Sequence, residues 1–188
     1  MSEPVFKMPA IVSREEWGAR PPKHADPAHT PKRIVLHHSW SPDSRGWKGR
    51  STLKGIQNYH MDKQAWSDIA YHFVIAPDGT TYAGVDPLVR GTHCGGTPPA
   101  GASRVFGNTG SIGVCLIGNF DSETVPVPAW NALISLLDGL KAKYRIPDAD
   151  VFGHFEAWTV PPKTCPGKVL AHAMGWEKRW LKAYHGRG

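Results

Sequence analysis

One short segment of the sequence brings together three side chains that can do chemistry. Residues 153–167 read GHFEAWTVPPKTCPG and contain His154, Lys163 and Cys165 around two consecutive prolines. Neutral imidazole and thiolate bind zinc readily, and a catalytic zinc site typically has three protein ligands with water at the fourth position. The segment therefore offers two candidate ligands, and a third must come from elsewhere in the chain.

A pair of histidines at the end of a predicted strand is the obvious source of that third ligand. Residues 33–39, RIVLHHS, form a short apolar, β-branched run that reaches His37 and His38. Successive side chains of a strand face opposite sides of the sheet, so only one of the two can face a given site. The pattern alone does not say which one does.

Two other interpretations of Cys165 compete with a zinc site. A cysteine activated by a histidine is the nucleophile of cysteine hydrolases, although no third group that would orient the histidine is evident here. The other interpretation is a core histidine near an inert cysteine, because cysteine is among the residue types most often buried. Residue types and spacing leave all three interpretations open.

Composition limits the class of protein and its partners. The chain has 188 residues, of which 40% are hydrophobic, and this suits one compact domain with a sizeable core. Its formal net charge of +6 favours acidic partners, but no nucleic-acid-binding motif accompanies the charge. No apolar run approaches the roughly 20 residues of a membrane helix, and the N-terminus lacks a secretory pattern. We therefore expect no nucleic-acid binding, no membrane insertion and no export.

Hydrophobic patterns predict an α/β fold in which a central mixed β-sheet is flanked by helices. Apolar runs bounded by turn residues predict strands at 33–39 and 149–154, a hairpin within 69–84, and a central buried strand within 111–120. Helical spacing predicts helices at 51–63, where Ser51 is the expected cap, at 128–144 and at 167–184. Residues 1–32 should form an irregular arm on a domain of residues 33–188, and residues 91–110 a loop that lines a site.

Several further side chains have expected structural roles. Trp40 and Trp47 follow the predicted histidine strand and are expected to pack against the protein rather than to stack on sugars. His60 and His72 are expected to be structural. Cys115 should be a small hydrophobic residue in the central strand.

Five motifs resemble, in order along the chain, the peptidoglycan-recognition and type 2 amidase superfamily. They are SREEWGARPP (13–22), IVLHHS (34–39), AYHFVIAPDGT (70–80), NTGSIGVCLIGNF (108–120) and GHFEAWTVPPKTCPG (153–167). The resemblance covers about residues 13–170, and within the superfamily the chain is most similar to the small zinc amidases that tailed phages use as lysozymes. Animal recognition proteins usually have a short disulfide near residues 51–63, where this chain has no cysteine.

The resemblance implies a Zn²⁺ cofactor and the residues that hold it. The ligands would be His37, His154 and Cys165, and His38 would face away from the ion. Zinc lowers the pKa of a bound water and polarises a carbonyl, which suits amide hydrolysis.

The resemblance also implies roles for three residues beyond the ligands. Tyr71 would line the metal site as a catalytic residue, and Lys163 would be a second catalytic residue that stabilises negative charge on the tetrahedral oxygen. His93 would contact the substrate.

The function implied is that of an N-acetylmuramoyl-L-alanine amidase. Such an enzyme hydrolyses the amide between the lactyl group of muramic acid and L-alanine in bacterial peptidoglycan. We expect a monomer that acts as a phage or prophage endolysin and stays in the host cytoplasm until it reaches the cell wall. The alternative is a recognition protein that binds peptidoglycan without cutting it, as superfamily members without the cysteine ligand do.

Overall fold

The computed structural model describes residues 8–96, 98, 100, 106–158 and 163–185. Parts of three predicted segments lie outside the described residues. These parts are residues 1–7 of the arm, residues 97, 99 and 101–105 of the long loop, and residues 159–162 of the segment that holds Lys163 and Cys165.

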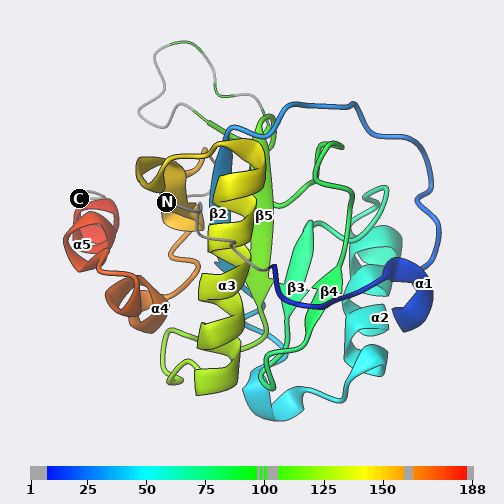
Figure 1. The fold of residues 1–188 in the computed structure, drawn as a ribbon, viewed down its shortest axis with the longest axis horizontal. Coiled ribbons are helices and arrows are strands. Elements are labelled where there is room, and N and C mark those ends of the chain that lie inside the picture. The colour runs from blue at the N-terminus through cyan, green and yellow to red at the C-terminus, as the bar shows by residue number, and fades with distance from the viewer. Residues whose placement is uncertain (1–7, 97, 99, 101–105, 159–162, 186–188) are drawn as a thin grey trace, which may run out of the picture.

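A six-stranded mixed sheet forms the centre of the molecule, as the sequence predicted (Figure 1). Its strand order is β1-β4-β3-β5-β2-β6, and only the β3–β4 hairpin pairs antiparallel. The strands are β1 (Ile11–Val12), β2 (Arg33–His38), β3 (Phe73–Ile75), β4 (Thr81–Ala83), β5 (Ser111–Leu116) and β6 (Val151–Gly153). β5 lies between β3 and β2 and is buried along its whole length, so the prediction of a central strand is confirmed.

Helices cover both faces of this sheet. α3 (Val127–Tyr144) lies across β2 and β5 in Figure 1, and its leucines pack on Ile34, Leu36 and Val114. Leu53 of α2 (Arg50–Asn58) packs with Val74 and Cys115 on the opposite face. The alternation of side chains along β2 and β5 thus separates two apolar clusters, one on each face.

The helix predicted over 51–63 is α2, which begins one residue earlier and ends at Asn58. Gly49 is the N-cap of α2, whereas the Ser51 hydroxyl donates to the Lys48 carbonyl at 2.8 Å, so Ser51 is not the cap. The chain then continues directly into one π-helical turn, η2 (Tyr59–Lys63).

Short 3₁₀ turns occur at η1 (Ser44–Gly46), η3 (Asp148–Asp150) and η4 (His154–Glu156).

The closing helix predicted over 167–184 is two helices instead of one. α4 (Lys168–Ala173) and α5 (Glu177–His185) are separated at Gly175, whose φ is 71°. A left-handed residue cannot continue a right-handed helix, and glycine adopts this conformation without a side-chain clash. The helical spacing of the apolar residues continued across the break and concealed it.

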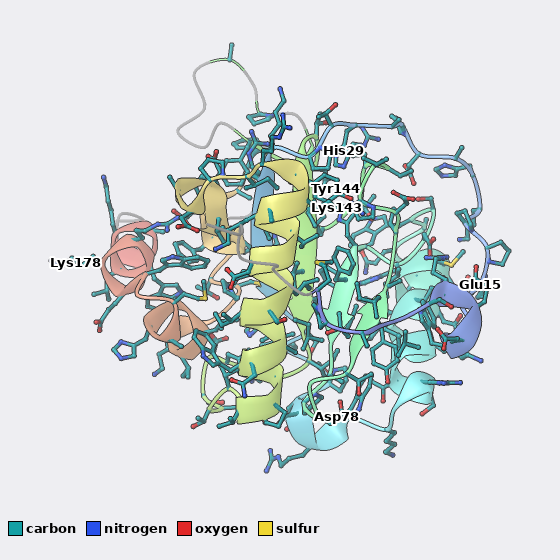
Figure 2. All side chains as sticks on the ribbon, in the orientation of Figure 1. Glu15, His29, Asp78, Lys143, Tyr144 and Lys178 are labelled. Atoms are coloured by element: carbon teal, nitrogen blue, oxygen red, sulfur yellow. The ribbon has the colours of Figure 1, made fainter. Side chains whose placement is uncertain are left out.

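Outward-facing charged side chains cover much of the remaining surface. Figure 2 shows Glu15, Asp78 and Lys178 at the outside of the molecule. Among the described residues, the structure has no helix with the length and apolar character needed to cross a bilayer.

The N-terminal segment is more regular than the predicted arm. β1 adds an edge strand beside β4, and α1 (Arg14–Trp17) follows it. The Ser13 hydroxyl accepts from the Glu16 backbone N–H while the Glu16 carboxylate accepts from the Ser13 N–H, which is a capping box. Trp17 is 1% exposed, and its indole N–H donates to the Ala83 carbonyl at 2.7 Å. The segment is therefore attached to the sheet by a buried aromatic ring.

Replacing Trp17 by alanine should lower the free energy of unfolding by about 3 to 5 kcal/mol, because it removes a fully buried aromatic side chain. Trp17→Phe should cost clearly less, since it keeps most of the apolar contact and loses the hydrogen bond to Ala83. Urea unfolding of the two variants and the wild type measures both effects. Equal stability of Trp17→Ala and wild type would contradict this account of the N-terminal segment.

Candidate metal centre

Three candidate ligands from distant parts of the chain converge at one edge of the sheet. His37 lies near the end of β2, and His154 follows β6, which pairs parallel with β2 through Leu36 and Gly153. The Phe155 N–H donates to the Cys165 carbonyl at 2.7 Å and brings the third residue alongside. Ligand atoms of His37, His154 and Cys165 all lie within 4.8 Å of one another. We refer to these three residues as the outer group.

The structure also decides which histidine of the pair faces this group. His37 pairs with Cys115, and its ring centroid lies 4.3 Å from that of His154. His38 points to the other side of the sheet, where its Nδ1 accepts the Phe120 backbone N–H at 3.1 Å. The backbone N–H of His38 donates to Cys165 Sγ at 3.3 Å, which favours the thiolate form that a metal requires.

His93 fixes which nitrogen of His37 is available to a metal. His93 Nε2 lies 3.1 Å from the Ser111 carbonyl, which can only accept, so this nitrogen carries the proton. The other nitrogen of His93, Nδ1, then accepts from His37 Nε2 over 2.9 Å. His37 Nδ1 is left as a lone pair, 3.8 Å from Cys165 Sγ. Burial, together with nearby histidines, lowers the pKa of His37 well below its usual range and keeps the ring neutral.

The position of His93 differs from the one that the sequence suggested. Instead of facing the substrate it is 5% exposed and lies behind His37, where a backbone carbonyl holds it. We therefore expect it to orient a ligand. A glycine signals this arrangement in the sequence: a Cβ on Gly113 would lie 2.5 Å from the His93 ring. Glycine inside a buried strand marks such a close approach.

A second cluster shares His37 and was not predicted. Ligand atoms of His37, His93 and Cys94 also lie within 4.8 Å of one another, and we refer to them as the inner group. Its two imidazoles are already joined by a hydrogen bond. Burial raises the pKa of both thiols, but the His38 backbone N–H donates to Cys165 Sγ and lowers its pKa, whereas Cys94 Sγ lies 3.2 Å from His93 Nδ1, which already accepts from His37. The outer group has better chemistry for a metal.

The outer group opens into a groove that also contains the two predicted catalytic residues. This cavity of about 350 Å³ is lined by the outer group and by Tyr71, Lys163, Trp40, His38, Asp121 and Thr164. The Tyr71 ring centroid lies 5.3 Å from that of His37. Burial raises the pKa of Tyr71 well above its usual range, so its hydroxyl keeps its proton. Lys163 is exposed at the groove.

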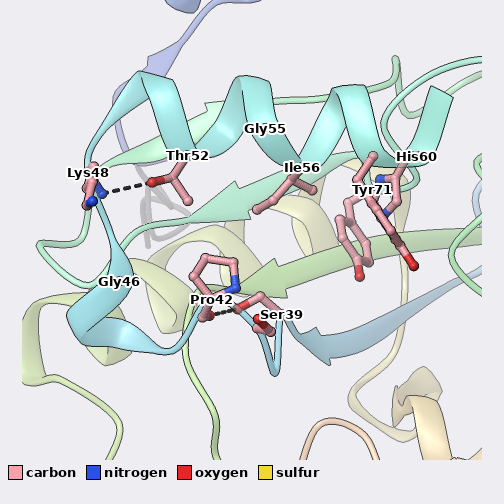
Figure 3. A pocket seen from close by; sticks show the side chains of 11 residues that line it. Ser39, Pro42, Gly46, Lys48, Thr52, Gly55, Ile56, His60 and Tyr71 are labelled. Atoms are coloured by element: carbon pink, nitrogen blue, oxygen red, sulfur yellow. Dashed lines mark hydrogen bonds between the residues drawn. The ribbon is translucent and has the colours of Figure 1, made fainter. Parts of the chain in front are cut away.

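A larger cavity of about 440 Å³ adjoins this groove, and Tyr71 lines both. Figure 3 shows it between α2, which contributes Ile56, and the loop that contains Ser39 and Pro42. Lys48 adds a cation at one end. The two cavities together provide space for an extended ligand that passes over the outer group.

His60 and His72 lie beside this centre and bond to the backbone. The Ala70 N–H donates to His60 Nδ1 at 3.1 Å. For His72, Nδ1 accepts the Gly113 N–H at 2.8 Å, and Nε2 donates to the Val89 carbonyl at 2.9 Å. These bonds require neutral imidazoles, so both rings serve the fold.

Removing the imidazole of His93 should weaken zinc binding by about 10- to 100-fold, because the proton on His37 Nε2 loses its acceptor and the ligand ring loses its orientation. Competition with a chromophoric chelator measures the affinity. His93→Gln, whose amide oxygen can accept the same proton, should recover part of it. His29→Gln is a matched control, because His29 stacks on His72 and contacts none of the ligands. Unchanged zinc affinity in His93→Ala would contradict the orienting role.

Acid should destabilise the fold partly through His72. Burial lowers the pKa of His72 from 6.5 to about 4, so between these pH values the unfolded chain binds more protons than the folded one. The contribution of His72 to the free energy of unfolding is therefore complete above about pH 6.5. It decreases by about 3 kcal/mol as the pH falls to 4. Urea unfolding across this range should give a shallower pH slope for His72→Gln than for wild type. A residual slope is expected from His60, whose pKa is also about 4 because of burial; identical slopes in the two proteins would contradict the assignment.

Comparison with known proteins shows which family this chain belongs to. The family model described as N-acetylmuramoyl-L-alanine amidase matches residues 27–168. Peptidoglycan-recognition protein SD of Drosophila simulans is 30% identical over 164 residues, which cover 85% of this chain and 81% of that protein. An N-acetylmuramoyl-L-alanine amidase of Sus scrofa is 31% identical over 184 residues, which cover 92% of this chain and 28% of that protein.

These relatives correct one expectation from the sequence. We expected a phage or prophage endolysin in the cytoplasm of its host, whereas the relatives named above come from an insect and a mammal. That expectation rested on the similarity of the motifs to small phage amidases, on the absence of a secretory pattern and on the absence of a cysteine within residues 51–63. The matches over most of the chain outweigh these indications, and the location in a phage host is wrong.

Solved structures of related proteins share the fold. The crystal structure of Drosophila peptidoglycan recognition protein SD has a TM-score of 0.73 and 28% identity, and the match covers 88% of this chain and 92% of that one. A Drosophila PGRP-LB variant in complex with tracheal cytotoxin has a TM-score of 0.70 and 28% identity over 88% and 94% of the two chains. The chain belongs to the N-acetylmuramoyl-L-alanine amidase family, within the superfamily that includes the peptidoglycan-recognition proteins.

Proposed function

We propose that this protein is a zinc-dependent N-acetylmuramoyl-L-alanine amidase. It hydrolyses the amide between the lactyl group of muramic acid and L-alanine in bacterial peptidoglycan. The observation that carries the proposal is the convergence of His37, His154 and Cys165 at the floor of an open groove, in a chain of this family.

The chemistry of the outer group fits zinc. Two imidazoles and one thiolate are ligands that zinc prefers, and three protein ligands leave a coordination position for water or substrate. His37 Nδ1 is already the free nitrogen, and a backbone N–H already stabilises the sulfur of Cys165. A zinc ion held by His37, His154 and Cys165 would supply Lewis acidity and would make water a nucleophile near neutral pH.

Two side chains of the groove act on the carbonyl under attack. The Tyr71 hydroxyl keeps its proton and so donates a hydrogen bond, but it cannot serve as a base. The ammonium of Lys163, on the same groove, stabilises negative charge as it develops on the carbonyl oxygen.

The cysteine-hydrolase interpretation is less consistent with the geometry. Burial raises the pKa of the Cys165 thiol to about 12, so without a bound cation it is a poor nucleophile at neutral pH. His37 Nδ1 lies 3.8 Å from its sulfur, and the other nitrogen of that ring bonds to His93 rather than to a carboxylate. The neutral ring of His93 stabilises a protonated His37 less than the carboxylate of a catalytic triad would.

The larger cavity beside Tyr71 provides room for the stem peptide (Figure 3). Lys48 at this cavity and the net charge of +6 suit a peptide and a wall polymer rich in carboxylates. A Drosophila relative has been crystallised with tracheal cytotoxin, which supports peptidoglycan fragments as the ligand class. We infer that the peptide extends along α2 while the scissile amide lies over the outer group.

Digestion of purified cell wall tests the reaction directly. Mass spectrometry should detect stem peptides that begin with a free L-alanine amine, together with glycan strands whose muramic acids carry free lactyl carboxylates. A chelator should abolish the release, and added zinc should restore it. Release that persists at full rate in the metal-free protein would contradict the proposal.

Two cysteine variants separate the enzyme from a binding protein and from a cysteine hydrolase. Cys165→Ser should lose at least about 100-fold in rate and still bind cell wall, because the metal loses its thiolate. Cys94→Ser is the matched control and should retain activity within about threefold. Wall binding without cleavage by the zinc-loaded wild type would instead identify a recognition protein. Alkylation that inactivates the zinc-loaded wild type as fast as the metal-free one would favour a cysteine nucleophile.

A further inference from the structure

Trp40 is an exposed indole at the opening of the metal groove. Its side chain is 62% exposed, and it lines the same cavity as His37, Lys163 and Cys165. Among the described residues it belongs to none of the apolar clusters that form the core, whereas Trp47 packs with Tyr82. The expectation that Trp40 packs against the protein is therefore wrong, and its apolar face is available to a ligand.

The backbone holds this indole in an unfavourable conformation. Trp40 has a φ of 57°, a left-handed value that bulky residues rarely adopt. The Trp40 N–H donates to the Gly118 carbonyl at 3.0 Å, and the Ser39 N–H donates to the Leu116 carbonyl at 3.0 Å. The Ser39 hydroxyl adds a bond to the Pro42 carbonyl at 2.7 Å. The end of β5 thus fixes the residue, and strain retained in this way is typical of functional sites.

The chemistry around the scissile amide indicates what the indole contacts. On one side of that amide lies the pyranose ring of muramic acid, whose C–H groups form an apolar face. On the other side lies a peptide with carboxylates, for which Lys48 provides a cation. A flat, uncharged aromatic surface suits the sugar and offers nothing specific to a carboxylate.

We propose that Trp40 forms a sugar subsite in which the indole stacks on the pyranose ring next to the scissile amide. This proposal rests on the proposed amidase function for its substrate, and it assigns to Trp40 a role in specificity. The subsite discriminates a substrate attached to glycan from a free peptide that carries only the lactyl group. Because stacking is made equally in the ground state and the transition state, it acts on KM rather than on kcat.

A pair of substrates that differ only in the sugar tests the subsite. Muramyl dipeptide carries the pyranose, and the N-lactyl dipeptide lacks it. Trp40→Ala should raise KM about five- to tenfold for muramyl dipeptide with little change in kcat, and should leave kcat/KM for the lactyl dipeptide within twofold of wild type. Trp40→Phe, which keeps an aromatic face, should recover most of the loss.

The control is Leu88→Ala, which removes another exposed apolar side chain, 52% exposed and outside the residues that line the groove. It should behave as wild type on both substrates. Thermal unfolding and zinc content of each variant exclude a folding or metal defect. Equal losses on both substrates, or no loss on either, would overturn the sugar subsite while leaving the amidase proposal intact.

Binding of the glycan alone tests the subsite without any turnover. The disaccharide of N-acetylglucosamine and N-acetylmuramic acid should quench part of the tryptophan fluorescence of the zinc-loaded wild type. The quenching should be absent in Trp40→Phe, and the affinity should fall about five- to tenfold in Trp40→Ala. Unchanged quenching and affinity in these variants would refute the role of Trp40, even in a protein that binds wall without cutting it.

Discussion

Parallel pairing of β2 with both β5 and β6 is the constraint on which the candidate site depends. The pairing places the ends of three strands at one edge, so that His37 and His154 meet although 117 positions separate them in the numbering. The same register sets the direction of each side chain: the His37 ring lies beside His154 and the His38 ring lies beside Phe120. A shift of the β2 register by one residue would exchange the directions of the two side chains. The outer group would then lose the ring nitrogen of His37.

Behind the ligands, backbone groups rather than side-chain charges set the chemistry. A carbonyl of β5 holds His93, His93 holds His37, and the N–H of His38 contacts the sulfur of Cys165. Each contact is a hydrogen bond of a buried group, so it is maintained only while the sheet is intact. The outer group is therefore part of the fold, and the proposed binding of zinc and the folding stability should be linked.

The sequence predicted the sheet better than the details around the candidate site. Continuous apolar runs identified β2 and β5, and the ordered motifs, through their family resemblance, pointed to His37, His154 and Cys165, whose ligand atoms the structure brings within 4.8 Å of one another. The roles of His93 and Trp40 depend on which way a loop residue points, and periodicity carries no information about that. The break at Gly175 and the edge strand β1 were missed because apolar spacing continued through the first, and because the second is only two residues long.

Cobalt substitution tests most directly whether one cation binds His37, His154 and Cys165. Co²⁺ bound by a thiolate in a four-coordinate site shows a sulfur-to-metal charge-transfer band and intense visible d–d bands. The account predicts both in the wild type at one equivalent of metal, loss of the charge-transfer band in Cys165→Ser, and its retention in Cys94→Ser. A spectrum without a thiolate band, or a band that disappears with Cys94 and survives the loss of Cys165, would contradict it.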